Sequence, residues 1–179
     1  MVHQKMTYSP KQIHYSNFKG KEMNENPITK EGYEKVQDEL NHLIKVVREE
    51  LRVTIAEARE LGDLKENAEY HAAKEKQSQV EGRISQLQGI IATSKVIDIS
   101  QVSSDKIVFG ATVTITNIDT DEEVTYKLVG ESESNMKEGK VSFASPLGKA
   151  LIGKEEGDTV VVRAPKGNIE YEVVSIEYK

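Results

Sequence analysis

The turn that decides the fold has the sequence Gly62-Asp63-Leu64-Lys65-Glu66-Asn67-Ala68-Glu69-Tyr70-His71-Ala72-Ala73-Lys74-Glu75. It joins two long segments with helical patterns, and its glycine is a residue that commonly ends a helix. Because almost no sequence separates the two patterns, we expect the helices to lie side by side and antiparallel. Two carboxylates, Asp63 and Glu66, would then be exposed at the far tip of a rod.

The segment before this turn predicts the first helix. Thr29 is a favourable N-cap, and Lys30 and Glu31 follow it in the first turn. Val47 and Leu51 are apolar residues four positions apart, and this spacing interrupts the heptad pattern that precedes it. It predicts a stutter, which would locally unwind a supercoil. The apolar residues before that step recur at the heptad spacing of a coiled coil: Tyr33, Val36, Leu40, Leu43 and Val47.

The second helix is predicted to begin at Asp63, to end near Lys95 and to pair with the first. A helix of ~30 residues is roughly 45 Å long. We therefore expect residues 27–97 to form an antiparallel coiled-coil hairpin with an acidic tip at residues 62–67. The stripe of the second helix is Ala73, Gln77, Val80, Ile84, Leu87 and Ile91.

From Val96 onward the apolar pattern has a period of two, which is typical of half-buried strands. Turn sequences separate the runs, and residues 146–152 predict one short helix. The fold class expected for the whole chain is α+β, with a compact domain at residues 103–179 after the hairpin. The candidate strands are Lys95–Ile99, Ala111–Ile118, Glu123–Val129, Lys140–Ala144, Thr159–Ala164 and Ile169–Tyr178.

Residues 1–26 show neither a periodic pattern nor an apolar face. We expect a disordered N-terminal extension there. An alternative is that Met23 is the true start and that the preceding sequence is not part of the natural chain. Either way, we expect residues 1–22 to be dispensable for folding and activity, since they lie at the opposite end of the first helix from the turn.

Composition limits the classes of protein to which the chain can belong. It has 179 residues and a formal net charge of −6, which argues against a general DNA-coating protein but leaves contact with nucleic acid inside a larger complex open. It has no cysteine, which excludes disulfides and thiolate metal sites. No apolar run approaches the length of a membrane span. We expect a cytoplasmic monomer with no membrane partner.

The two carboxylates at the tip have two interpretations. Asp63 followed by Glu66 fits an aspartate version of a capping box, which serves only to begin a helix. Alternatively, the ionised carboxylates hold a hard cation such as Mg²⁺, which takes oxygen ligands. Two exposed carboxylates make a weak site alone, so a partner that brings phosphates and a second metal would have to complete it.

Several motifs resemble those of the Gre family of bacterial transcript-cleavage factors, specifically the GreA type. The tip run Gly62–Glu75 is preceded by Ile55-Ala56-Glu57-Ala58-Arg59-Glu60. The Glu69–Ala73 run favours the GreA type over the GreB type. The C-terminal half adds Phe109-Gly110-Ala111-Thr112-Val113, Thr125-Tyr126-Lys127-Leu128-Val129-Gly130 and Ser145-Pro146-Leu147-Gly148-Lys149-Ala150-Leu151-Ile152-Gly153-Lys154. The resemblance covers about Pro27 to Lys179.

This resemblance implies a function that the residue pattern alone does not establish. Residues 103–179 would have an FKBP-like fold and dock on bacterial RNA polymerase, while the coiled coil enters the secondary channel of the polymerase. Asp63 and Glu66 would help to hold the second Mg²⁺ of the polymerase and activate water, so that the polymerase itself cleaves the 3′ end of backtracked nascent RNA. The chain would thus activate an enzyme without being one.

The resemblance also assigns contact residues. Arg59 and Lys74 match the basic patch that contacts the extruded RNA, although lysine lacks the planar guanidinium of the arginine often found at the second position. Ser145 and Pro146 match a loop that contacts the polymerase, and a proline that sets the turn into a helix is the structural alternative. Without the family, Arg59 and Lys74 would be assigned to a solvated helix face.

Three other functions compete with this one. An FKBP-type peptidyl-prolyl isomerase needs an aromatic-lined pocket, and residues 103–179 contain only Phe109, Phe143 and a few tyrosines. A secondary-channel regulator without cleavage activity would carry a different set of tip acids. A purely structural coiled coil would explain the heptads but not the separate globular domain.

Overall fold

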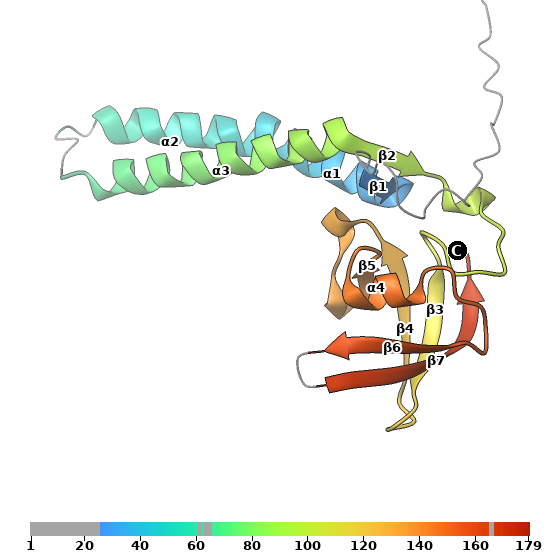
Figure 1. Ribbon diagram of the computed structural model, residues 1–179. Helices are drawn as coiled ribbons and strands as arrows, with labels where there is room; N and C mark the ends of the chain where they lie inside the picture. Colours follow the sequence, from blue (N-terminus) through green and yellow to red (C-terminus); the bar gives the residue numbers. More distant parts are fainter. Residues whose placement is uncertain (1–25, 61, 63–65, 165–166) are drawn as a thin grey trace, which may run out of the picture.

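A helical hairpin and a β-sheet domain make up the molecule (Figure 1). The computed structural model describes residues 26–60, 62, 66–164 and 167–179. The long helices lie in the first half of the chain and most strands in the second, which confirms the predicted α+β class. Residues 1–25 lie outside the described part, so the expectation of a disordered extension stays a prediction.

The hairpin is built from two long antiparallel arms. The first arm runs without a break through α1 (Lys30–His42), the π-helical turn η2 (Leu43–Val47) and α2 (Arg48–Glu60), and the second is α3 (Ala68–Thr93). The Thr29 hydroxyl oxygen accepts a hydrogen bond of 2.9 Å from the amide of Gly32, which confirms the predicted N-cap. Within the described ranges, no helix is both long and apolar enough to cross a lipid bilayer.

Apolar side chains at the predicted heptad positions hold the arms together. Leu87 is fully buried and packs in one cluster with Val36 and Ile28, near the globular domain. Leu51, Val80 and Ile84 form a second cluster halfway along the hairpin. Toward the tip the seam continues through small and branched residues, with Ile55, Ala58 and Ala73 buried.

The π-helical turn η2 lies one step before the predicted stutter at Val47–Leu51. A π turn holds an extra residue, which rotates the following helix relative to the preceding one. Leu43, Ile44 and Val47 all become partly buried against the second cluster, so the wide turn keeps the apolar stripe facing α3. The heptad pattern thus predicted the position of the irregularity to within a few residues, but it did not predict that the irregularity is a π-helical turn.

A short parallel sheet closes the base of the hairpin and was not predicted. Strand β1 (Asn26–Thr29) pairs with β2 (Ser94–Ile97), so that Ile28 lies opposite Val96 and Thr29 opposite Ile97. The strand predicted at Lys95–Ile99 is therefore confirmed in part as β2, whereas its pairing with β1 was not predicted. Only four residues separate the start of β1 from the first helix, too few to show a period.

The globular domain contains one five-stranded sheet in the order β5-β4-β3-β7-β6. All neighbouring strands are antiparallel except β4 and β5. Short 3-10 turns fill the connections: η3 (Ile99–Gln101), η4 (Glu131–Glu133) and η5 (Met136–Glu138). The strands are β3 (Thr112–Asn117), β4 (Glu123–Val129), β5 (Lys140–Ser142), β6 (Thr159–Ala164) and β7 (Gly167–Glu177), close to the predicted ranges.

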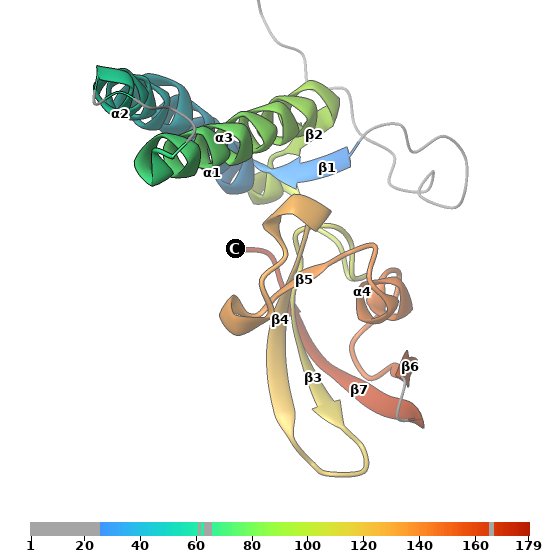
Figure 2. The same cartoon turned by 90° about the vertical axis from the view of Figure 1, so that its left-hand side faces the viewer.

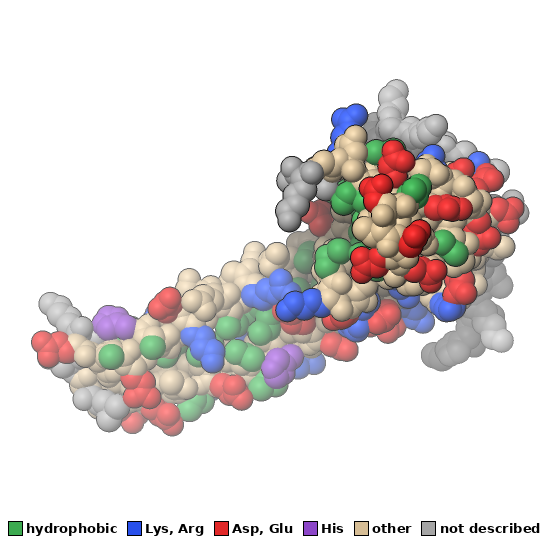
Figure 3. Space-filling view, turned by 90° about the horizontal axis from the view of Figure 1, so that it is seen from below, with side chains coloured by type: hydrophobic (Ala, Val, Ile, Leu, Met, Phe, Trp, Pro, Cys, Tyr) green, Lys and Arg blue, Asp and Glu red, His purple; other side chains and the backbone are tan. Residues whose placement is uncertain are grey.

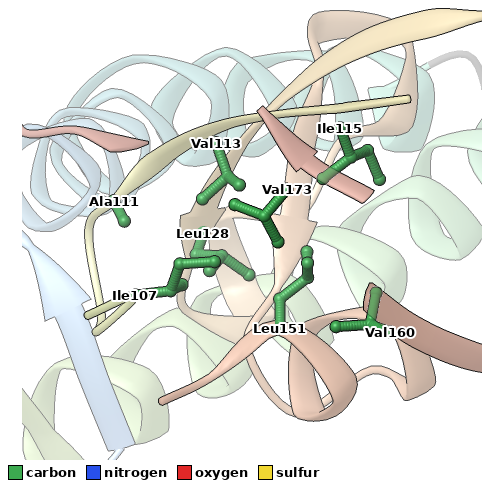
Figure 4. Close-up of a cluster of buried hydrophobic side chains, with 8 residues drawn as sticks. All are labelled: Ile107, Ala111, Val113, Ile115, Leu128, Leu151, Val160 and Val173. Atoms are coloured by element: carbon green, nitrogen blue, oxygen red, sulfur yellow. The ribbon is translucent and has the colours of Figure 1, made fainter. Parts of the chain in front are cut away.

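The helix α4 (Pro146–Leu151), one residue shorter than predicted, covers the apolar face of this sheet. Figure 4 shows the core between them, with Leu151 pointing toward Leu128, Val160 and Val173. The alternating threonines of β3 face outward and are half-buried, while Val113 and Ile115 are fully buried. Figure 2 shows that the connection between β4 and β5 lies directly below β1, so this domain meets the hairpin at its base.

Two ion pairs cross the hairpin on its surface. Arg83 on α3 holds Glu39 on α1 with two hydrogen bonds of 2.6 and 2.8 Å, and Arg48 holds Glu81 in the same two-pronged way. The hydrogen bond from Arg83 is the main reason why the pKa of Glu39 lies below its ordinary value of 4.5. Both side chains are about two-fifths exposed, at 42% and 43%, so solvent screens the pair.

The Glu39–Arg83 pair predicts part of the acid sensitivity of the hairpin. Because the folded pKa of Glu39 is lowered, its stabilising contribution is complete above the ordinary value of 4.5 and is lost as the pH falls through the lower folded value. Melting temperatures measured between pH 7 and pH 3 should therefore fall less steeply below pH 5 in Glu39→Gln than in the original chain. Glu34→Gln, an exposed glutamate on the same helix, is the control. Identical acid slopes in Glu39→Gln and the original chain would contradict the assignment.

Candidate functional site

The candidate site is the end of the hairpin farthest from the globular domain (Figure 1). The first arm ends at Glu60 and the second begins at Ala68. Gly62 has a positive φ of 78°, and its amide donates to the carbonyl of Arg59. That left-handed conformation suits glycine and supports its predicted role at the helix end. Glu66 is exposed just before the second helix, while Asp63 lies outside the described residues.

Asn67 organises the start of the second arm. Its side-chain oxygen accepts a hydrogen bond of 3.0 Å from the amide of Tyr70, so Asn67 is the N-cap of α3. Its side-chain amide donates a bond of 2.7 Å to the carbonyl oxygen of Ala58 on the other arm. One residue therefore begins one helix and ties it to the end of the other.

The helix start at Asp63 and the capping box of Asp63 and Glu66 are therefore wrong predictions. Glu66 precedes the N-cap instead of lying in the first turn of the helix. Asparagine is as good an N-cap as aspartate. Its cross-arm bond to Ala58 favours the later start, and that bond is a tertiary contact that a local capping pattern cannot show.

The structure brings Arg59 and Lys74 together on one face near the tip. Both line a groove of about 360 Å³ between α2 and α3, and Arg52 lines it too. The Arg59 guanidinium lies 5.8 Å from the centre of the Tyr70 ring, within the range of a cation–π contact. The Lys74 ammonium donates a bond of 2.7 Å to the side chain of Gln77. Three cations around one groove suit a negatively charged strand.

The carboxylate chemistry at the tip suits Mg²⁺ only in part. A glutamate oxygen is a hard ligand of the type that Mg²⁺ prefers, and Glu66 is exposed to a partner. Among the described residues, no group of three or more His, Cys, Asp or Glu side chains is placed to hold a metal ion. The described donors therefore fit a shared site and fall short of a complete one.

Ser145 and Pro146 lie on the globular domain, away from the tip, at the start of α4. The Ser145 hydroxyl oxygen accepts a hydrogen bond of 3.0 Å from the amide of Gly148, and Pro146 occupies the first turn. The pair therefore has a structural role. Pro146 is nevertheless exposed, so it is available for contact with a partner.

Acidic side chains cover much of the globular face that Figure 3 shows. Such a surface repels phosphates. The groove with Arg52, Arg59 and Lys74 is the better candidate for contact with nucleic acid.

Sequence reasoning missed two residues of this site. Asn67 had a local signal, because it is a favourable cap directly before an uninterrupted helical run. Arg52 had none, since its place beside Arg59 in the groove depends on how the two arms pack.

Comparisons with known proteins agree over both parts of the chain. The model of the family "Transcription elongation factor, N-terminal" matches residues 26–96, and that of "Transcription elongation factor, GreA/GreB, C-term" matches residues 102–178. The chain is 54% identical to Transcription elongation factor GreA of Xylella fastidiosa strain 9a5c over 85% of this chain and 97% of the relative. It is 56% identical to the protein of that name from Rickettsia conorii, over 86% and 94%.

A solved structure is also similar. The GreA factor homolog 1 protein of Thermus thermophilus is 30% identical, with 86% of this chain and 99% of that chain covered, and the TM-score is 0.40.

Asn67 gives the first test of the tip geometry. Asn67→Ala should lower the free energy of unfolding by about 2 kcal/mol, with about 1 kcal/mol from the lost cap and about 1 kcal/mol from the lost bond to Ala58. Asn67→Asp keeps the capping oxygen but cannot donate to Ala58, so it should lose about half as much. Urea unfolding followed by circular dichroism measures both values. An unchanged midpoint in Asn67→Ala would show that the tip does not depend on this residue.

Proposed function

Because the chain belongs to the GreA/GreB family of transcription elongation factors, we propose that it stimulates cleavage of the 3′ end of RNA in backtracked or arrested RNA polymerase. The hairpin, residues 27–97, enters the secondary channel of the polymerase, and the domain at residues 103–179 docks outside it. The observation that supports this division most directly is the exposed Glu66 at the end of a long narrow arm, remote from the globular domain.

The reach of the hairpin suits delivery of a side chain into another protein. The first arm spans 31 residues, Lys30 to Glu60, and so is roughly 45 Å long. Its cross-section is only two helices wide, and the apolar seam and cross-arm ion pairs make it self-supporting. An arm of this shape can enter a channel without unfolding.

Asp63 and Glu66 are proposed to hold Mg²⁺ jointly with carboxylates of the polymerase. The bound ion would supply polarisation of the scissile phosphate and of water. The part of this chain is to bring carboxylate oxygens to that point, to orient a water molecule by accepting its hydrogen bond, and to leave the rest of the coordination sphere to the partner. The chain is thus an activator, and the RNA cleavage activity belongs to the polymerase.

Arg59 and Lys74 are proposed to contact the extruded RNA strand, which passes the groove between α2 and α3. Cations around a groove bind phosphates without regard to base sequence. The contact of Arg59 with the Tyr70 ring favours a guanidinium held along the groove and leaves its hydrogen-bond donors to the strand. The lysine at position 74 offers a point charge instead of a planar fork.

The globular domain is proposed to carry the polymerase contact and to have an FKBP-like fold. A helix packed on one face of a five-stranded sheet supports that fold. Exposed Pro146, next to Ser145 at the start of α4, is a candidate contact with the polymerase. We further propose that the protein acts as a monomer in the cytoplasm, where its partner works.

The isomerase alternative finds little support. Phe109 is 5% exposed, and its ring packs edge to face on Phe143 with the ring centres 5.8 Å apart. These two aromatic side chains pack against each other, and neither lines the pocket at the junction or the groove near the tip. A channel regulator without cleavage activity remains as a distinct outcome of the next experiment.

The tip carboxylates give the decisive test. Asp63→Asn with Glu66→Gln should reduce stimulated cleavage in stalled, backtracked complexes by roughly a hundredfold, as removal of a charge-stabilising group does in enzyme sites. Binding to polymerase should persist, since the docking domain is untouched. Glu69→Gln, an exposed glutamate in the first turn of α3, is the matched control and should retain cleavage. Cleavage at the original level in the double variant would rule out the shared metal site, and no cleavage with the original chain would favour the regulator.

The basic groove gives a second functional test. Arg59→Ala should weaken stimulated cleavage about tenfold, the loss expected when one charge-assisted hydrogen bond of about 1.5 kcal/mol is removed. Lys74→Ala should act in the same direction but less. Binding to polymerase without backtracked RNA should not change in either. Lys76→Ala, exposed on α3, is the control. Crosslinking of the RNA 3′ end to the factor that is undiminished in the double variant would contradict the RNA contact.

A further inference from the structure

The junction between the hairpin and the globular domain centres on one carboxylate. Glu133 lies in η4, the turn that follows β4, and its side chain reaches the base of the hairpin. One carboxylate oxygen accepts a bond of 2.9 Å from the Thr29 amide and one of 3.1 Å from the Gly130 amide of its own turn. The other oxygen accepts a hydrogen bond from the Thr29 hydroxyl.

The hydroxyl of Thr29 makes two hydrogen bonds, which together fix its orientation relative to Glu133. It accepts from the amide of Gly32 at 2.9 Å and donates to Glu133. The carboxylate thus lies at the N-terminus of α1, where a helix favours negative charge. Thr29 is only 4% exposed and Glu133 is half-buried, so the bonds between them are partly shielded from water.

Steric fit reinforces the same contact. A Cβ atom on Gly32 would lie 2.1 Å from a carboxylate oxygen of Glu133, and one on Gly130 would lie 2.5 Å from the carbonyl oxygen of Pro27. At Gly130 backbone therefore meets backbone, whereas at Gly32 the Glu133 side chain occupies the space that a Cβ would need. A second polar contact at the junction, between Lys140 and Glu31, is 4.0 Å long and partly exposed, so it constrains the junction far less.

We infer that Glu133 is a positioning residue: by holding the N-terminus of the first helix, it sets the direction in which the hairpin leaves the globular domain. The effect of this orientation on RNA cleavage rests on the proposed function. A tilt of 10° at the base of an arm this long moves the tip by roughly 8 Å. A shift of about 1 Å in a reacting group can already cost a hundredfold in rate. The junction therefore controls chemistry at a tip that Glu133 never touches.

The first experiment measures geometry and needs no polymerase. The chain has no cysteine, so cysteines introduced at exposed Glu57 on α2 and exposed Glu122 before β4 can be spin-labelled selectively. Double electron–electron resonance on the full chain should give a narrow distance distribution. Glu133→Gln, which keeps the volume but replaces one accepting oxygen with a donor, should broaden it, and Glu133→Ala should broaden it further.

Two matched variants separate positioning from general damage. Glu131→Gln changes an exposed glutamate of the same turn and should keep the narrow distribution. Thr29→Ser keeps the hydroxyl that donates to Glu133 and should also keep the narrow distance distribution. Distributions of Glu133→Gln and Glu133→Ala that match the original chain would overturn the inference, whatever the protein does to polymerase.

The second experiment measures whether the orientation of the hairpin affects stimulated RNA cleavage. In backtracked complexes, Glu133→Gln should lose at least tenfold in stimulated cleavage while its affinity for polymerase stays within twofold of the original. A broadened distance distribution with undiminished cleavage would overturn the link between junction and tip. If the original chain itself stimulates no cleavage, the proposed function fails, and the distance measurement alone decides whether Glu133 holds the hairpin.

Discussion

The apolar seam between the two arms is the interaction on which everything else depends. Leu87, Ile84 and Val80 on α3 meet Val36, Leu51 and Ile28 from the other arm and the base strand. Burial of each such side chain is worth about 1.5 to 3 kcal/mol, whereas the exposed ion pairs add little. Without that seam there would be no straight arm, and the tip residues would have no fixed distance from the globular domain. The polar contacts refine a geometry that hydrophobic burial establishes.

The two ends of the hairpin use the same device for different purposes. At the tip, Asn67 caps α3 and also binds the carbonyl of Ala58 on the other arm. At the base, Thr29 caps α1 and also binds Glu133 of the globular domain. A helix N-terminus has free amides that need acceptors. In this fold each cap also makes a long-range connection, so the places where helices begin are the places where the parts of the molecule are joined.

The sequence predicted those features whose cause is local. The heptad positions from Val36 to Leu87, the cap at Thr29, and the strand β6 with the turn before it all follow from residues within a few positions of one another. The pairing of β1 with β2 joins residues more than sixty positions apart, and the bonds between Glu133 and Thr29 join residues 104 positions apart, so no local pattern shows them. At the tip, the sequence pattern predicted a helix start at Asp63, and the bond between Asn67 and Ala58, which no local pattern shows, favours the later start. The roles of Arg59 and Lys74 came from family resemblance, and packing of the arms then placed both beside the same groove.

The short sheet of β1 and β2 has a consequence for how such a protein can change its length. It ties the start of one arm to the end of the other at the base, while Asn67 and Ala58 tie them again at the tip. With both ends fastened, neither helix can slide along the other. A residue added to one arm alone has to be absorbed by an irregular turn such as η2, whereas a matched change of seven residues in each arm would alter the reach by roughly 10 Å and keep the heptad positions in register. The two fastenings therefore favour changes of reach in steps of seven residues made in both arms together.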